Sequence, residues 1–230
     1  MDLSDIRRRI DRLSDQIVGR LKDRSYFPLN PPVYIVGGIE IAGARDQTFL
    51  THSLAGLERY HAALGRYSYP DQHPLLDDVL PDAPVRREVA TLAIPQSHLR
   101  LWDALLPYYQ TLLPQICPPG DDVQSYGETV YVDADLLVRL HERIIIGRYV
   151  AHSKAERQPE ILALLHRPAD LRDALIDVAR EAAVLAKAAD LARKYELSPA
   201  AVQGLFRWVM DQTLTLEVRY LQQVNGVAEE

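Results

Sequence analysis

The sequence predicts an all-α fold, a bundle of long helices in a single domain that spans residues 1–230. Apolar residues recur every three or four positions over most of the chain, which is the period of an amphipathic helix. No segment shows the strict alternation of a half-buried strand, and there is no internal repeat. Prolines gather in a few connecting segments, where they end helices. Helices with apolar faces bury them against one another, so we expect a helical bundle.

The first half of the chain holds three predicted helices. The first spans residues 3–24, where one apolar stripe consists of Leu3, Ile6, Ile10, Leu13, Ile17 and Leu21. The second and third are expected at residues 46–67 and 96–113, the latter with a kink at Pro107. The connections are expected as loops with short helical turns at most, at about residues 26–45, 68–95 and 114–132.

The second half is more regular and predicts four further helices. They are expected at residues 133–154, 159–166, 168–195 and 199–224. Asp133, Pro168 and the pair Ser198–Pro199 are typical helix start signals.

Composition excludes several classes of function. Apolar residues make up 47% and charged residues 25%, as in soluble globular proteins. A net charge of −6 argues against nucleic-acid binding. A single cysteine, Cys117, excludes a disulfide framework and a multi-thiolate metal site. No apolar run approaches the roughly 18 residues that span a bilayer, and the polar start is no secretory signal. We therefore expect a cytoplasmic protein with neither a membrane nor a nucleic-acid partner.

Cations interrupt the apolar face of the predicted helix at 133–154. Its stripe reads Leu136, Leu140, Arg143, Gly147, Val150 and Lys154. Eleven residues complete about three turns and rise about 16 Å, so Arg143 and Lys154 share one face. These side chains either converge on a ligand lying over Gly147 or bury their stems and hold their charges in water.

The last helix carries the opposite anomaly. Thr213 and Glu217 lie in the middle of an apolar stripe, far from either end. A buried carboxylate is costly unless it is paired or keeps its proton. Either Glu217 is the partner of a core cation such as Arg143, or it serves a functional site, and we favour the second interpretation.

Three more charged residues lie on or beside apolar helix faces. Asp177 and Glu181 are one turn apart in the predicted helix 168–195, and Arg7 lies beside Ile6 and Ile10. Taken singly, each could be solvated surface charge. Taken together with Arg143, Lys154, Thr213 and Glu217, they predict a pocket for a small polycarboxylate inside the bundle.

Other chemistries leave no sign in the sequence. There is no glycine-rich phosphate loop, no His-Glu-x-x-His pair and no serine nucleophile elbow. The histidines are scattered, and Cys117 has no base near it in the predicted helices. We therefore predict neither a cofactor nor a metal site.

Five segments in order resemble the all-helical chorismate mutases, in particular the yeast-like eukaryotic type. They are Ile6–Asp11, Asp23–Tyr34, Phe49–Asp71, Arg143–Lys154 and Glu217–Leu221. The resemblance covers nearly the whole chain and is most specific from Arg143 to Lys154. It implies an isomerase that converts chorismate to prephenate in phenylalanine and tyrosine biosynthesis, with no cofactor, as a homodimer.

The resemblance also implies roles for individual residues. Arg7 and Arg143 match the arginines that bind the substrate carboxylates. Lys154 and a protonated Glu217 match the two groups at the ether oxygen, which gains negative charge in the transition state. Glu181 matches the residue that holds the substrate hydroxyl, and Thr213 contacts a carboxylate. Asp177 replaces an asparagine of the yeast-like type and resembles the small bacterial enzymes.

The family's effector site for aromatic amino acids matches less well. Its adjacent arginines are here Gly65 and Arg66, its Gly-Ser pair is Gly127 and Glu128, and a following threonine is Tyr131. The connection from Lys194 to Pro199 is much shorter than the family's. A degenerate effector site at Arg66, Gly127 and Glu128 is therefore expected.

Two other functions share the resemblance. The chain could be a related enzyme, an isochorismate–pyruvate lyase or an aminodeoxychorismate mutase. It could also be a non-catalytic sensor of aromatic amino acids or a regulatory partner of another enzyme. The altered effector residues weigh against the sensor, and the length of the chain weighs against the lyase, because lyases of this fold are short.

Overall fold

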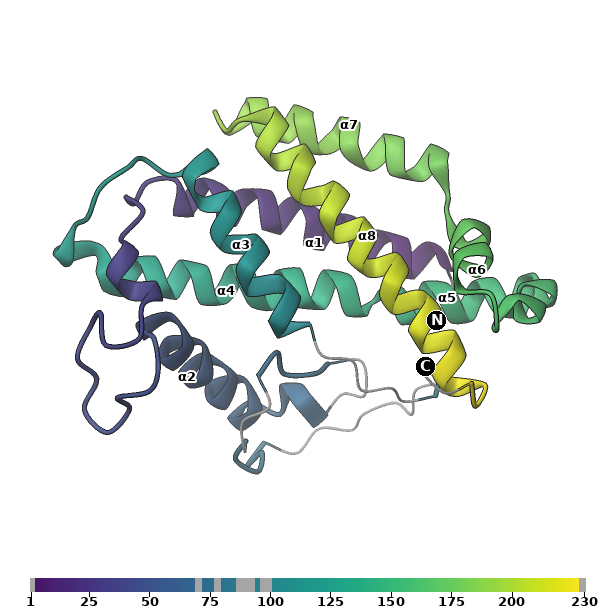
Figure 1. Ribbon diagram of the computed structural model, residues 1–230, viewed down its shortest axis with the longest axis horizontal. Helices are drawn as coiled ribbons and strands as arrows, with labels where there is room; N and C mark the ends of the chain where they lie inside the picture. The colour runs from purple at the N-terminus through teal and green to yellow at the C-terminus, as the bar shows by residue number, and fades with distance from the viewer. Residues whose placement is uncertain (1–2, 69–71, 77–79, 86–93, 96–100, 228–230) are drawn as a thin grey trace.

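The computed structural model describes residues 3–68, 72–76, 80–85, 94–95 and 101–227. Within these ranges the secondary structure is helical and contains no strand, as the sequence predicts (Figure 1). The α-helices are α1 (Leu3–Arg24), α2 (Phe49–Ala63), α3 (Trp102–Ile116), α4 (Tyr126–Ile145), α5 (Gly147–Arg157), α6 (Pro168–Leu175), α7 (Val178–Lys194) and α8 (Pro199–Val224). Short 3₁₀ helices are η1 (Pro31–Tyr34), η2 (Arg66–Ser68), η3 (Val123–Ser125) and η4 (Pro159–Leu164).

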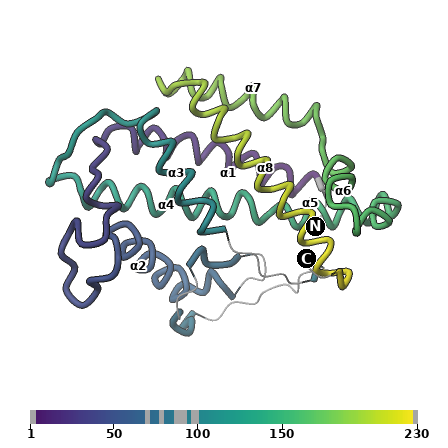
Figure 2. The backbone as a smooth tube through the Cα atoms, in the orientation of Figure 1, coloured from purple at the N-terminus to yellow at the C-terminus, as the bar shows by residue number. Residues whose placement is uncertain are grey.

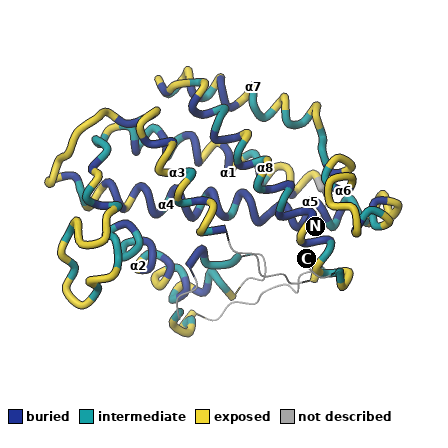
Figure 3. Tube along the Cα trace, in the orientation of Figure 1, coloured by how far each residue is buried: buried dark blue, intermediate teal, exposed yellow. Residues whose placement is uncertain are grey.

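Helix α4 runs through the middle of the bundle (Figures 1 and 2). It packs against α1, α2 and α8, and α7 lies along α8 on the other side of α1. Helix α5 continues α4 in nearly the same direction and packs against the C-terminal half of α8. Thirteen residues of α4 are buried, and the tube coloured by burial is dark along this helix (Figure 3).

A buried ion pair joins the start of the chain to its middle. Arg24 at the end of α1 donates from Nε to Oδ1 of Asp133 in α4, over 2.7 Å. Its other nitrogens donate to the carbonyl oxygens of Phe27, Pro28 and Leu29. The hydroxyl groups of Tyr34 and Tyr109 also donate to the Asp133 carboxylate. Arg24 and Asp133 are both fully buried, so this cluster fixes η1 and α3 against the bundle.

The ends of α1 and α8 lie where the sequence predicts them, at residues 3–24 and 199–224. Other bounds differ. The helix predicted at 133–154 begins earlier, at Tyr126, and is divided at Ile146 into α4 and α5. Asp133 is therefore no start signal but a buried residue inside α4. The helix predicted at 168–195 is divided at Ile176 and Asp177 into α6 and α7.

Three shorter predictions also need correction. The helix predicted at 159–166 is the 3₁₀ helix η4. The one predicted at 46–67 is α2 followed by η2. The helix predicted at 96–113 is α3, which extends to Ile116, while residues 96–100 lie outside the described part of the chain. The loops predicted at 26–45 and 114–132 contain η1 and η3, and the second ends early because α4 already begins at Tyr126.

Candidate active site

A cavity of about 100 Å³ lies where α1, α4, α5, α7 and α8 meet. All seven of the charged or hydroxyl-bearing residues predicted from the helix faces line it: Arg7, Arg143, Lys154, Asp177, Glu181, Thr213 and Glu217. These residues come from segments up to 210 positions apart, between Arg7 and Glu217. The bundle therefore brings together cations and carboxylates that are dispersed along the sequence.

Lys154 and Glu217 face each other in this cavity. Lys154 Nζ lies 3.9 Å from Glu217 Oε2 and donates a hydrogen bond to the carbonyl oxygen of Leu175 at the end of α6. Glu217 Oε2 is buried and has no hydrogen-bond partner among the described residues. Burial raises the pKa of Glu217 to about 7, although the nearby Lys154 and Arg143 lower it. A carboxyl group in this position is partly protonated at neutral pH.

A hydrogen bond to α1 orients the buried Arg143 side chain. It is 5% exposed, and its Nε donates to the hydroxyl oxygen of Ser14 over 3.3 Å. Ser14 uses its own hydrogen to bond the carbonyl oxygen of Ile10, over 2.8 Å, so its oxygen is left to accept from Arg143. Burial lowers the pKa of Arg143 to about 10, which leaves the guanidinium charged at neutral pH.

Arg7 and Asp177 form the open side of the cavity. Arg7 Nη2 lies 3.5 Å from Asp177 Oδ2, and both side chains are nearly half exposed. Asp177 is the residue before α7, and its carboxylate accepts a hydrogen bond from the backbone N–H of Arg180 over 3.0 Å. It thus caps the helix, where a negative charge is favourable. Asp177 and Glu181 consequently do not lie in one continuous helix as predicted.

Arg180 also lines the cavity, although it is not among the residues predicted from the sequence. Its guanidinium pairs with Asp11 of α1 over 2.5 Å. The spacing of Asp177 and Arg180, three residues apart, could have indicated that they share a face.

Gly147 has a different place from the one we expected. It does not line the cavity, because α8 lies directly over it. A Cβ atom on Gly147 would lie 2.6 Å from Thr213 Cγ2 and 3.4 Å from Glu217 Cγ. The space that the sequence assigned to a ligand over Gly147 is therefore filled by helix packing. Thr213 still faces the cavity, with its hydroxyl donating to the Val209 carbonyl oxygen over 2.7 Å.

The residues expected at a degenerate effector site lie apart within one chain. Arg66 pairs with Glu142 near the end of α4 over 2.6 Å and donates to Gln72 over 3.0 Å. Gly127 and Glu128 lie in the first turn of α4, about 21 Å along the helix from Glu142. A single chain therefore does not bring Arg66 and Glu128 together.

Metal and membrane sites have no counterpart in the described residues. No group of three or more histidine, cysteine, aspartate or glutamate side chains is placed to hold a metal ion there. Within the same residues, no helix combines the length and the apolar character that crossing a membrane requires.

Known proteins resemble this chain in sequence and in fold. Residues 126–218, which contain α4 to most of α8, match the family model described as chorismate mutase type II. A chorismate mutase of Emericella nidulans is 28% identical over 97% of this chain and 92% of its own length. The chorismate mutase of Schizosaccharomyces pombe is 28% identical over 96% of this chain and 95% of its own length. The cytosolic chorismate mutase 2 of Zea mays is 29% identical over 96% of this chain and 95% of its own length.

Solved structures share the same arrangement of helices. AtCM1 with tyrosine bound in its allosteric site is 26% identical, with a TM-score of 0.82, over 98% of this chain and 97% of its own. The chorismate mutase of Candida albicans, in complex with L-Trp, is 24% identical and covers 99% of this chain and 93% of its own. Its TM-score of 0.85 shows that the two chains share a fold. In sequence this chain is similar to chorismate mutases of fungi and plants, and it shares their all-helical fold.

Proposed function

We propose that this protein is a chorismate mutase, an isomerase that rearranges chorismate to prephenate. The relatives that carry this name match it over nearly its full length. The reaction is pericyclic, so it forms no bond to the enzyme and needs no cofactor. Catalysis then consists of holding a compact conformer of the substrate and stabilising the charge that develops in the transition state.

The observation that carries this proposal is the pairing of Lys154 with an unsatisfied, buried Glu217. In the transition state the breaking C–O bond places negative charge on the ether oxygen. Lys154 supplies a cation there, and Glu217 supplies a proton donor when it is neutral. A pKa of about 7 keeps a large fraction of Glu217 protonated at and below neutral pH. Donors preorganised for such an oxygen are usually the largest catalytic contribution.

The remaining residues are proposed to bind and orient the substrate. Arg143 and Arg7 bind its two carboxylates, with Thr213 beside one of them. Glu181 and Asp177 hold the hydroxyl group, and Arg180 adds positive charge at the same side of the cavity. Gly147 contributes through helix packing, as described above.

One assay tests the reaction. Purified protein is expected to remove the ultraviolet absorbance of chorismate and to produce prephenate, identified after acid conversion to phenylpyruvate. The Lys154→Met variant, purified in parallel, controls for a mutase of the expression host. In a parallel assay with isochorismate as the substrate, salicylate and pyruvate as products would identify a lyase instead. No consumption of chorismate would contradict the proposal and favour a sensor.

We further propose that the protein acts as a cytoplasmic homodimer of one-domain subunits. Several large apolar residues are more than half exposed in one chain, among them Ile35, Val36, Tyr60 and Tyr131. One maize relative is named cytosolic, whereas others are named chloroplastic. Sedimentation equilibrium at micromolar concentration is expected to give twice the mass of the 26.0 kDa chain.

A further inference from the structure

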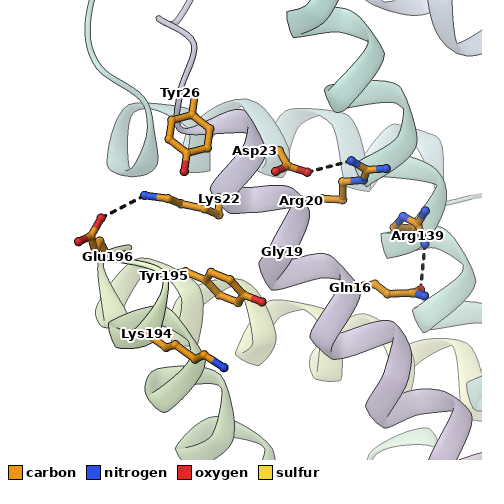
Figure 4. Close-up of a pocket in the computed structure, with 10 residues that line it drawn as sticks. All are labelled: Gln16, Gly19, Arg20, Lys22, Asp23, Tyr26, Arg139, Lys194, Tyr195 and Glu196. Carbon is orange, nitrogen blue, oxygen red and sulfur yellow. Dashed lines mark hydrogen bonds and ion pairs between the residues drawn. The ribbon is translucent and has the colours of Figure 1, made fainter.

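A second cavity lies at the opposite end of α1 from the candidate active site (Figure 4). It has a volume of about 510 Å³, is open to solvent, and is bordered by the C-terminal half of α1, by Arg139 of α4 and by the end of α7. Small-molecule sites generally measure about 300–1,000 Å³, so its size suits a ligand. None of the residues assigned to the mutase reaction lines it, and the proposed function leaves it without a role.

Positive charge gathers around this cavity in a chain whose net charge is −6. Four basic side chains line it, namely Arg20, Lys22, Arg139 and Lys194, against the two acidic side chains Asp23 and Glu196. The chain has few lysines, Lys22, Lys154, Lys187 and Lys194, because most of its basic residues are arginines. Two of those lysines lie at this cavity.

Lys194 remains without an acidic partner once the others are paired. Arg20 contacts Asp23 over 2.8 Å and Asp135 over 2.6 Å, and Arg139 contacts the same Asp135 over 2.9 Å. Lys22 Nζ lies 3.5 Å from Glu196 and 4.8 Å from the centre of the Tyr26 ring. In the described part of the chain, Lys194 makes no ion pair or hydrogen bond. Figure 4 shows its side chain beside Tyr195, which separates it from Lys22.

Gly19 forms the floor of the cavity. It lies inside α1, where glycine destabilises a helix relative to alanine. A Cβ atom on Gly19 would meet no atom within 4 Å, so no neighbouring helix requires a glycine at this position. The missing side chain lets a bound molecule approach the backbone of α1 closely.

Glu196 at the rim follows the end of α7 and has a left-handed conformation. Its φ is 58°, and the backbone N–H of the next residue, Leu197, donates to the Ala192 carbonyl oxygen over 2.9 Å, as at many helix C-termini. The conformation places Glu196 beside Lys22, which leaves Lys194 as the cation available to a ligand.

We propose that this cavity binds a small organic anion, whose carboxylate or phosphate group lies at Lys194 and whose body covers Gly19. The cavity supplies the volume, Lys194 supplies the charge, and Gly19 supplies the open floor.

Amide NMR of the full chain tests this proposal. Malonate and inorganic phosphate serve as probes, added separately at 0.15 M NaCl, and their comparison distinguishes a carboxylate site from a phosphate site. At least one probe is expected to give saturable shifts of the amides of Gly19, Lys22 and Tyr195, with a Kd of about 10 mM or below. Reading these amides separates the second cavity from the cationic candidate active site, whose residues lie elsewhere.

Two variants and two controls sharpen the test. Lys194→Gln is expected to weaken binding about fivefold, the effect of one removed charge at close range. Lys187→Gln removes a lysine of the same helix outside this cavity and is expected to change binding less than about twofold. Gly19→Gln is expected to abolish the shifts while leaving the unfolding temperature equal or higher. Gly56→Gln, at an equally open position inside α2, controls for the added side chain.

The proposal is overturned by any of three results. One is the absence of saturable shifts at these amides for both probes up to about 50 mM, beyond which affinity is negligible. The second is an equal loss of binding in Lys187→Gln and Lys194→Gln, which would indicate general attraction of anions. The third is undiminished binding in a folded Gly19→Gln variant.

Discussion

Two buried carboxylates in this protein differ in what surrounds them, and the difference decides their charge. Asp133 accepts hydrogen bonds from Arg24, Tyr34 and Tyr109, which favour its ionised form and oppose the rise in its pKa that burial causes. Glu217 has one oxygen without any hydrogen-bond partner, and burial raises its pKa to about 7. Donors favour the anion and desolvation favours the acid. The first carboxylate is suited to structure and the second to proton-dependent chemistry.

Replacing Glu217 with glutamine is expected to remove an alkaline limit on activity. In the wild type, kcat should fall as the pH rises through about 7, because the ionised carboxylate repels the negative ether oxygen. Glutamine keeps a neutral donor at every pH, so Glu217→Gln should stay active and lose this fall. The measurement is the pH profile of kcat for both proteins. Identical profiles would mean that Glu217 does not titrate in the working range.

The same substitution is expected to change the pH dependence of stability. The folded pKa of about 7 lies above the unfolded value of 4.5, so the folded state binds more protons between these pH values. The wild type therefore loses stability as the pH rises from about 4.5 to 7, and Glu217→Gln escapes this loss, on the order of 3 kcal/mol. Urea unfolding at pH 5 and pH 8 measures it. A constant difference between the two proteins at both pH values would contradict this prediction.

Ser14 is expected to orient Arg143. The Ser14 hydroxyl donates its single hydrogen to the Ile10 carbonyl oxygen, so the hydroxyl oxygen accepts from Arg143 Nε. This contact leaves the outer guanidinium nitrogens of Arg143 directed away from Ser14. Ser14→Ala should raise the KM for chorismate about three- to tenfold, as expected for one hydrogen bond to a charged group, with a smaller change in kcat. Ser14→Thr keeps the hydroxyl and should restore the KM. An equal loss of kcat and no rescue by threonine would contradict this orienting role.

Among the helices, the ends of α1 and α8 follow from the sequence. A stripe of helical period runs along each of them, with Thr213 and Glu217 as polar members in α8, and Pro28 and the pair Ser198–Pro199 mark the boundaries. The divisions at Ile146 and at Asp177 were missed because the stripes continue across them. The capping role of Asp177 had a signal in its residue type, whereas Asp133 was misread because its partner, Arg24, lies 109 positions away.

The faces of the helices nonetheless identified most of the cavity. Charged residues in apolar stripes, such as Arg143 and Glu217, are informative because burial is costly for them. Arg7, Asp177 and Glu181 are each compatible with solvated surface charge when taken singly, so they indicate the pocket only in combination with the other charges on apolar helix faces. Contacts between helices, such as Ser14 with Arg143 or Gly147 with Thr213, follow from packing that no local pattern contains.

The contact between α5 and α8 requires a glycine at 147. Thr213 cannot turn away easily, because its hydroxyl is bonded to Val209 and its side chain is branched. Gly147→Ala is therefore expected to separate the helices, to destabilise the protein by about 1–3 kcal/mol and to lower kcat by misplacing Lys154 relative to Glu217. Urea unfolding and steady-state kinetics measure both effects.

Gly204→Ala in α8 is the matched control. Its Cβ atom would lie 4.0 Å from the Tyr108 hydroxyl, which is an ordinary contact, so stability and activity should be kept or improved. Equal stability of the Gly147 and Gly204 variants would show that α5 can shift without cost.

At the scale of the whole molecule, the Arg24–Asp133 cluster connects α1, η1, α3 and α4. Asp133→Asn leaves a buried guanidinium without its counter-charge, so the free energy of unfolding should fall by about 3–5 kcal/mol. Asp135→Asn, two residues further along α4 at a side chain with 15% exposure, should cost about 1 kcal/mol. Denaturant titration compares the two. Similar unfolding midpoints for both variants would show that the cluster contributes no more to stability than the ion pairs of Asp135 do.

Regulation by aromatic amino acids is expected to be weak. Arg66 is engaged by Glu142, and Gly65, with φ of 75°, stands where the family has a second arginine. Tyrosine and tryptophan at about 1 mM, the Kd of a weak site, should alter neither the KM nor the kcat by more than twofold. Substrate saturation curves with each amino acid measure this. A sigmoidal curve that tryptophan makes hyperbolic would reveal a working effector site.

The pairing of Arg24 with Asp133 also constrains how the chain is made. Helix α1 leaves the ribosome before its main neighbour, α4, which follows about a hundred residues later. At about 5–20 residues per second, the apolar face of α1 waits roughly 5–20 s for its partner. The contact between α1 and α4 therefore closes a long loop, whereas α7 and α8, which also pack together, are neighbours in the sequence.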